Sequence, residues 1–207
     1  AYEIPKRDWS SDVCSSDLAM AIMMASCSTP QENASSGEKP KDTVVAVNPV
    51  ERGSYLVTLS GCDHCHSPKI MTPQGPEIDS TRRLSGHPAD GKLPEVNWAM
   101  VQPGQWILCS QDLTAWAGPW GMSFPANLTP DSVTGTGSWS LDLFKQILRS
   151  GHHMGVPDAR PILPPMPWQS IGMMTDDDLS AVFSFLKSLP PISNRVPDPM
   201  PPPAPKK

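Results

Sequence analysis

The sequence has few charged residues and no long apolar stretch, and both shortages exclude classes of protein. Only 18% of its 207 residues are charged, and the net charge is −5. A nucleic-acid-binding protein needs a cluster of Lys and Arg to neutralise phosphates, and the chain has no such cluster. Its apolar runs are well short of the roughly 20 residues that span a bilayer as a helix. We therefore expect neither a nucleic-acid partner nor a transmembrane helix.

Cysteine is also scarce, whereas proline is abundant. Of the five cysteines, only Cys62 and Cys65 are close together in the sequence, which does not favour a disulfide framework. The 26 prolines gather at the ends and in the middle third, and they exclude a helical bundle along the whole length. We expect one small, soluble domain with disordered extensions.

The region before this domain has the features of a lipoprotein signal and a tether. Residues 18–27 (LAMAIMMASC) are apolar and end in small residues and a cysteine, and the stretch from Met24 to Cys27 resembles a lipobox. The polar residues 28–48 follow without periodicity, as in a flexible linker. An ordinary signal peptide or a frayed helix is the alternative. We expect lipidation of Cys27 to anchor the domain to a membrane surface.

Both ends of the chain carry segments that we exclude from the folded domain. Residues 1–18 make a poor signal start because three aspartates closely follow the two basic residues, and RDWSSDVCSSDL resembles translated sequencing-adapter sequence. We expect these residues to be non-native, so that residues 1–27 combine a foreign start with the signal. Residues 191–207 are rich in proline, which fixes φ and removes hydrogen-bond donors, and they predict an extended, solvated tail.

One motif carries specific chemistry. Residues 62–66 read Cys-Asp-His-Cys-His, a C-x-x-C-H sequence typical of covalent c-type haem attachment. Two thiols three positions apart on a helical turn reach the two vinyl groups of a porphyrin and form thioethers. His66 then lies beneath the iron and supplies an imidazole nitrogen. We expect one haem c, bound by Cys62, Cys65 and His66, with His64 as a spacer.

Two other interpretations of the cysteine pair fit the sequence less well. A thioredoxin-like site would follow a strand, whereas residues 50–57 predict a helix with Tyr55, Leu56 and Leu59 on one face. A zinc site would need a second pair of ligands at comparable spacing. The sequence has no second C-x-x-C, and His152-His153 is a poor substitute.

Through this motif and several other stretches, the chain resembles the monohaem class I c-type cytochromes, in particular long bacterial forms related to cytochrome subunits of periplasmic dehydrogenases. The resembling stretches are RGSYLV (52–57), CDHCHSP (62–68), NLTPD (127–131), TGSW (136–139), PPMPW (164–168) and LKSLPP (186–191). The resemblance implies an all-α, haem-wrapping fold over residues 49–190 and electron transfer rather than catalysis. It also implies export to the periplasmic side of a bacterial membrane, with dehydrogenase or oxidase components as redox partners.

The second axial ligand of a transfer cytochrome is normally a methionine. Met166 fits best, because neighbouring prolines hold its segment rigid and leave little conformational entropy to lose. In the superfamily that the chain resembles, the ligand methionine lies on such a loop before a C-terminal helix. Met154 and the pair Met173-Met174 are the other candidates. His152 and His153 follow a helix end at Gly151, where an interaction with the helix C-terminus explains them better than iron ligation.

Two further helices and a long insertion complete the expected fold. Ser140 and Gly151 delimit one helix, and Thr175 caps another whose apolar stripe should pack near Tyr55. Their apolar residues are Leu143, Phe144, Ile147 and Leu148 in the first, and Leu179, Val182, Phe183 and Leu186 in the second. The roughly 70 residues from His66 to Ser138 show little periodicity, which predicts an irregular insertion around the porphyrin. Within it, we expect Trp98, Trp106, Trp116 and Trp120 to fill space against the porphyrin, and Cys109 to be buried.

These observations favour a membrane-tethered electron carrier over an enzyme. With His66 and Met166 both on the iron, no position is open to a substrate. The alternatives are a haem enzyme or sensor with an open or labile sixth position, such as a peroxidase, and a cytochrome subunit of a larger dehydrogenase or oxidase complex. Whether Met166 coordinates separates the first alternative from the carrier, and a bacterial c-type peroxidase would also need a second haem motif.

Overall fold

A computed structural model describes residues 48–204 of the chain. The predicted signal, Cys27, and all but the last residue of the predicted linker lie outside this range, and so do residues 205–207. Their assignments stay predictions. Within residues 48–204, none of the helices combines the length and the apolar character that crossing a membrane would require.

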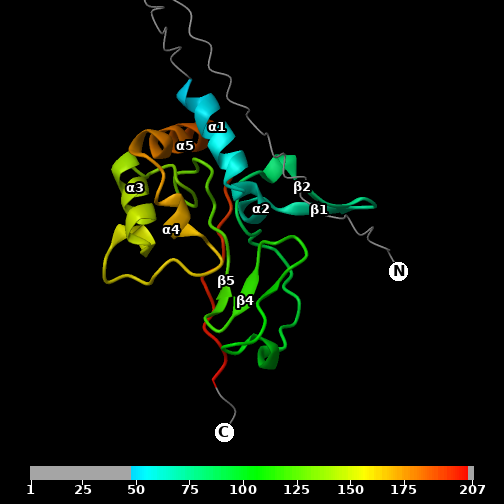
Figure 1. The fold of residues 1–207 in the computed structure, drawn as a ribbon. Helices are drawn as coiled ribbons and strands as arrows, with labels where there is room; N and C mark the ends of the chain where they lie inside the picture. The colour runs from blue at the N-terminus through cyan, green and yellow to red at the C-terminus, as the bar shows by residue number, and fades with distance from the viewer. Residues whose placement is uncertain (1–47, 205–207) are drawn as a thin grey trace, which may run out of the picture. The chain divides into compact units, whose positions relative to one another are not determined.

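The helices pack around one apolar cluster. They are α1 (Pro49–Leu59), α2 (Cys62–His66), α3 (Leu141–Ser150), α4 (Trp168–Ile171) and α5 (Asp176–Ser188), and α1 lies against α5 (Figure 1). The buried members of the main cluster are Leu56, Val57, Leu84, Phe144, Leu148, Leu179, Ala181, Val182, Phe183, Phe185 and Leu186. The helices at residues 141–150 and 176–188 confirm the two sequence predictions, including their caps at Ser140 and Thr175.

Helix α1 forms where the sequence predicts it, but its core face is different. Tyr55 and Leu59 are 56% and 69% exposed, whereas Gly53, Leu56 and Val57 are buried. These three residues follow the i, i+3, i+4 spacing of one helix face, and Tyr55 lies on another. The predicted packing of the last helix against α1 is confirmed, but its expected centre at Tyr55 is wrong. The contact runs through Gly53, where an added Cβ would lie 2.0 Å from the carbonyl oxygen of Ala181.

The segment between α2 and α3 contains strands, which corrects the expected all-α class. A hairpin pairs β1 (Lys69–Thr72) with β2 (Gly75–Ile78), and an antiparallel sheet has the order β3-β4-β5. Its strands are β3 (Leu108–Cys109), β4 (Trp116–Gly118) and β5 (Gly121–Ser123). Strands of two to four residues are too short to leave a detectable alternation in the sequence. The insertion also has its own apolar cluster, formed by Val101, Ala115, Ala117 and Met122.

Among the side chains of the insertion, Cys109 differs from its expected environment, whereas the packing of the tryptophans against the porphyrin stays a prediction. Cys109 is exposed rather than buried, and Trp106 is 68% exposed. Trp116 and Trp120 are half-buried, and their indole N–H groups donate to the carbonyl oxygen of Leu113 and to Ser123 Oγ. The indoles of Trp116 and Trp120 are thus part of the hydrogen bonding within the sheet region.

The proline-rich end packs against the domain as far as the structure describes it. We call residues 192–200 the C-terminal strap, which runs past β5 in Figure 1. Its Ile192 N donates to Thr129 Oγ1 (3.1 Å), and Met200 exchanges two backbone hydrogen bonds with Met122 of β5 (2.7 and 3.0 Å). The expectation of a solvated tail is wrong for the strap, because side-chain and backbone groups distant in sequence bind its backbone at Ile192 and Met200.

Candidate cofactor site

The C-x-x-C-H motif forms the single turn of α2. Gly61 precedes it in the left-handed region with φ 69°, and the extended Ser67 follows it. A helical turn places Cys62 and Cys65 on the same side, as attachment to two neighbouring vinyl groups requires. The thiols are half-buried and free, and Cys62 packs against the main apolar cluster. The turn that the sequence predicts is therefore present, with both thiols available.

The environment of the thiols differs from that of a thioredoxin-like pair. Burial, and to a smaller extent the neighbouring Asp63 carboxylate, raise the pKa of Cys62 to about 11. Burial also raises the pKa of Cys65. Reactive cysteines in C-x-x-C redox sites have a lowered pKa instead. Within residues 48–204, no three His, Cys, Asp or Glu side chains gather as a metal cluster would need.

His66 has the hydrogen bonding of an axial ligand. It is buried, and its Nδ1 lies 2.8 Å from the carbonyl oxygen of Ala126. A carbonyl oxygen only accepts, so Nδ1 carries the proton and Nε2 keeps a lone pair. Metal-binding histidines usually donate their other N–H to such a group. Burial also lowers the pKa of His66, which favours the neutral form that ligation requires.

Asp63, inside the motif, fixes the turn to the rest of the domain. Its carboxylate accepts from Arg83 Nε (3.0 Å) and Nη2 (2.7 Å) and from Ser67 Oγ (2.7 Å). Burial alone would raise the pKa of Asp63, but these hydrogen bonds outweigh it and hold the pKa below its usual range. The Arg83 guanidinium also lies over the Phe185 ring, 5.5 Å from its centroid. Sequence reasoning missed this pair because its partners are 20 residues apart.

Met166 lies on a loop that the structure secures at several points. It is half-buried and packs against the same main cluster as Cys62. The Pro164 carbonyl oxygen accepts from Ser123 Oγ (2.5 Å). The loop leads into α4, where the Trp168 indole occupies the space beside Gly151. The structure therefore brings Met166 and Cys62 to one cluster, and the assignment of Met166 as axial ligand stays a prediction.

The other candidate ligands have different surroundings. Met173 is 84% exposed, Met154 is also exposed, and Met174 is half-buried against the main cluster. His152 Nδ1 lies 2.9 Å from the carbonyl oxygen of Ser150, the last residue of α3. The predicted interaction of His152 with the helix C-terminus is confirmed.

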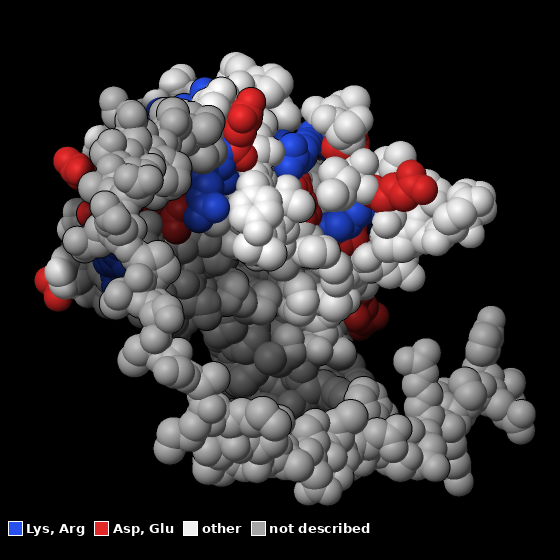
Figure 2. Space-filling model, turned by 45° about the horizontal axis from the view of Figure 1, so that its top comes forward, with Lys and Arg blue, Asp and Glu red and all other residues white. Residues whose placement is uncertain are grey.

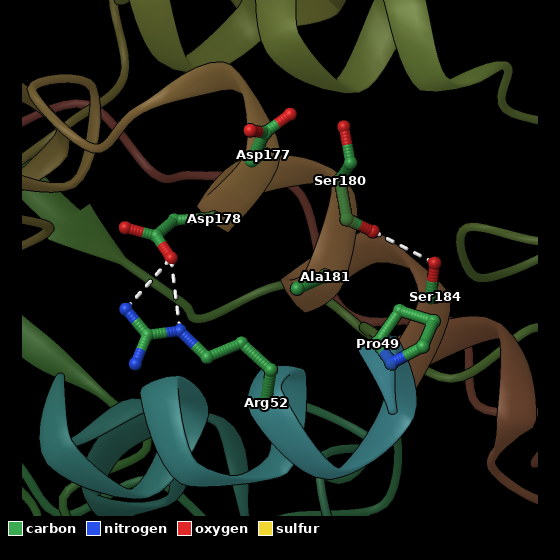
Figure 3. A pocket seen from close by; sticks show the side chains of 7 residues that line it. All are labelled: Pro49, Arg52, Asp177, Asp178, Ser180, Ala181 and Ser184. Carbon is green, nitrogen blue, oxygen red and sulfur yellow. Dashed lines mark hydrogen bonds and ion pairs between the residues drawn. The ribbon is translucent and has the colours of Figure 1, made fainter. Parts of the chain in front are cut away.

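A shallow hollow of about 470 Å³ lies between α1 and α5, but its Arg52 and Asp178 already form an ion pair at 2.9 Å (Figure 3). Ser184 Oγ likewise donates to the carbonyl oxygen of Ser180. On the described part of the face in Figure 2, acidic and basic side chains are interspersed rather than separated.

Known relatives of the chain are cytochrome subunits of dehydrogenases. Over 148 residues the chain is 33% identical to the cytochrome c subunit of a quinone alcohol dehydrogenase from Gluconacetobacter polyoxogenes, an alignment that covers 69% of this chain and 25% of the relative. The resemblance to c-type cytochromes is confirmed. The chain is also 27% identical, over 136 residues, to the gluconate 2-dehydrogenase cytochrome c subunit of Pantoea cypripedii, with 66% of this chain and 22% of the relative covered. No family model matches the chain.

A third relative is the fructose dehydrogenase cytochrome subunit of Gluconobacter japonicus, which is 26% identical over 137 residues, or 66% of this chain and 20% of the relative. The chain thus spans a quarter or less of the length of these three relatives. Their names are those of cytochrome subunits, which agrees with an electron carrier rather than an enzyme.

Proposed function

We propose that this chain transfers electrons through one covalently attached haem c and works as a cytochrome subunit, or part of one, for a periplasmic dehydrogenase. The observation that carries the proposal is His66 at the end of the C-x-x-C-H turn. Its Nδ1–H is committed to the Ala126 carbonyl, and Nε2 is therefore the nitrogen available to iron. The names of the relatives support a dehydrogenase as the partner.

Each residue of the site would have a defined role. The thiols of Cys62 and Cys65 would each add across a vinyl group, so that a C–S bond forms and the thiol hydrogen moves to the adjacent vinyl carbon. His66 Nε2 would donate its lone pair to the iron. Bound in this way, haem iron supplies one-electron chemistry by alternating between Fe(II) and Fe(III). Asp63 and Arg83 would keep the attachment turn fixed in both states.

Met166 would supply the second axial bond from its secured loop. The thioether favours the ferrous state and raises the reduction potential. The apolar side chains packed near Cys62 would act in the same direction on a bound haem, because a low-dielectric environment disfavours the extra charge of the ferric form. With both axial positions filled by side chains, the site would exchange electrons and bind no substrate.

The location of the protein is part of the same proposal. Lipidation of Cys27 would hold the domain at the periplasmic side of a bacterial membrane, and residues 28–48 would allow it to reach a donor and an acceptor. A dehydrogenase that oxidises its substrate would be the electron donor, and a membrane oxidase or quinone would accept the electron.

Covalent attachment is the first property to test. The chain would be expressed with a c-type maturation system as the wild type, as a Cys62→Ala/Cys65→Ala double variant, and as Cys109→Ala. Cys109 is the matched control because it is a free cysteine outside the motif. Intact mass and the spectrum of the denatured protein would be measured. We expect one haem on the wild type and on Cys109→Ala, and none on the double variant. A haem-free wild type, or attachment that survives the double substitution, would contradict the proposal.

A further inference from the structure

His66 is held by two segments that are distant from it in sequence. Gly86 N donates to the His66 carbonyl oxygen (2.7 Å), and the His66 ring donates to the Ala126 carbonyl oxygen (2.8 Å). The two segments are also joined to each other, because His87 N donates to the Pro125 carbonyl oxygen (3.1 Å). The orientation of the imidazole therefore depends on how both segments are anchored.

Asn194 of the C-terminal strap anchors the first segment on both sides of Gly86. Its Nδ2 donates to the carbonyl oxygens of Ser85 and His87, both at 2.8 Å. Its Oδ1 accepts from Ala89 N at 2.9 Å. Both donors and the acceptor of this one amide are thus used on the loop that carries Gly86.

The strap also holds the second segment, next to Ala126. Asn127 is buried, and its Nδ2 donates to the Ile192 carbonyl oxygen of the strap (2.8 Å) and to Thr134 Oγ1 (3.1 Å). The same Thr134 Oγ1 accepts from Asn194 N at 3.0 Å. The strap therefore fixes the spacing between the Gly86 loop and the Ala126 carbonyl.

We propose that Asn194 is a positioning residue for the axial ligand His66, an inference that rests on the proposed function. The Asn194 side chain holds the Gly86 loop, and its backbone N–H binds Thr134 beside the second segment, so Asn194 links the two segments and sets the hydrogen bond from His66 Nδ1 to the Ala126 carbonyl. That bond makes the imidazole a more basic ligand, which stabilises ferric iron and lowers the reduction potential. Loosening the strap at Asn194 should weaken the bond and raise the potential.

The test compares two substitutions at Asn194 with two controls on the same strap, all as haem-loaded protein. Asn194→Ala removes every side-chain contact, whereas Asn194→Asp keeps the acceptor for Ala89 N and loses both donors. Ser193→Ala changes an exposed neighbouring residue. Met200→Pro removes the donor to the Met122 carbonyl oxygen at the far end of the strap.

Three quantities would be measured for each variant: the midpoint potential, the rate at which the His66 Nδ1 proton exchanges with deuterium by NMR, and the urea midpoint of unfolding. At a fixed applied potential, we expect both Asn194 variants to lower the ferric-to-ferrous ratio by about two- to tenfold, where tenfold corresponds to about 59 mV for one electron. Their Nδ1 proton should exchange faster. The controls should match the wild type in both readouts, even if Met200→Pro is less stable.

Each other outcome counts against the proposal. Asn194 variants that lose stability but keep the wild-type potential and proton exchange would show a purely structural role. An equal shift of potential in Met200→Pro would show that general loosening is the cause, and failure of both Asn194 variants to mature would point to folding alone. A haem-free wild type would instead refute the proposed function itself, and that result appears before any variant is compared.

Discussion

The close contact between α1 and α5 predicts that an alanine at position 53 destabilises the protein. In an exposed helix, Gly→Ala stabilises by about 1 kcal/mol. At Gly53, however, the new Cβ would lie 2.0 Å from the Ala181 carbonyl oxygen and 2.7 Å from Phe185 Cβ. A backbone oxygen cannot rotate away, so the two helices must separate, and overpacking of this kind costs about 3 kcal/mol. The net expectation is a loss of about 2 kcal/mol.

The assay is urea unfolding of the haem-loaded protein, with Thr58→Ala as a control in the same helix. Thr58 is exposed on α1, and its substitution should change the free energy of unfolding by less than about 0.5 kcal/mol. A Gly53→Ala protein as stable as the wild type, or more stable, would refute the argument that α1 and α5 meet through this glycine.

Two further predictions concern a helix cap and an acid-sensitive contact. Thr175→Ala removes the hydrogen bond from Asp178 N to Thr175 Oγ1 (3.1 Å). The free energy of unfolding in urea should fall by about 1 kcal/mol. An unchanged urea midpoint would show that this cap does not stabilise the helix. Burial alone would raise the pKa of Asp112, but hydrogen bonds from Ser110 and Thr114 outweigh it and hold the pKa below its usual range. The stability this carboxylate contributes is thus present above its unfolded pKa of about 4 and is lost as the pH falls through the lower folded value. Asp112→Asn should flatten the loss of stability below about pH 4, and superimposable curves would contradict this assignment.

The sequence alone was sufficient to predict an element of the structure where several local signals agree. The helix over residues 141–150 has a side-chain cap at Ser140, apolar residues at helical spacing and a left-handed Gly151 at its end, and all three are present in the structure. The attachment turn is similarly local, because its five residues carry the whole pattern. The predicted core face of α1 was wrong because Gly53 determines the contact between α1 and α5. Glycine has no side chain, so it does not count as apolar in a sequence pattern.

The missed features depend on partners far apart in the chain. The acceptor for His66 is the backbone carbonyl of Ala126, 60 residues away, and any residue type could supply it. The strap depends on amide contacts of Asn127 and Asn194 that span 65 and up to 109 residues. Residues of this type are common in turns and on surfaces, so nothing in the local sequence distinguishes these two from solvated ones.

The most direct test of the central claim is the absorption spectrum of the haem-loaded protein in its oxidised and reduced states. In the family that the chain resembles, a weak far-red band of the ferric form reports iron–methionine ligation. We predict that the band is present in the wild type, lost in Met166→Ala and retained in Met174→Ala, a half-buried methionine against the same cluster. If the band is absent and the ferrous wild type readily binds carbon monoxide, the sixth position is open or weakly held, and the electron-carrier account with Met166 as ligand is contradicted.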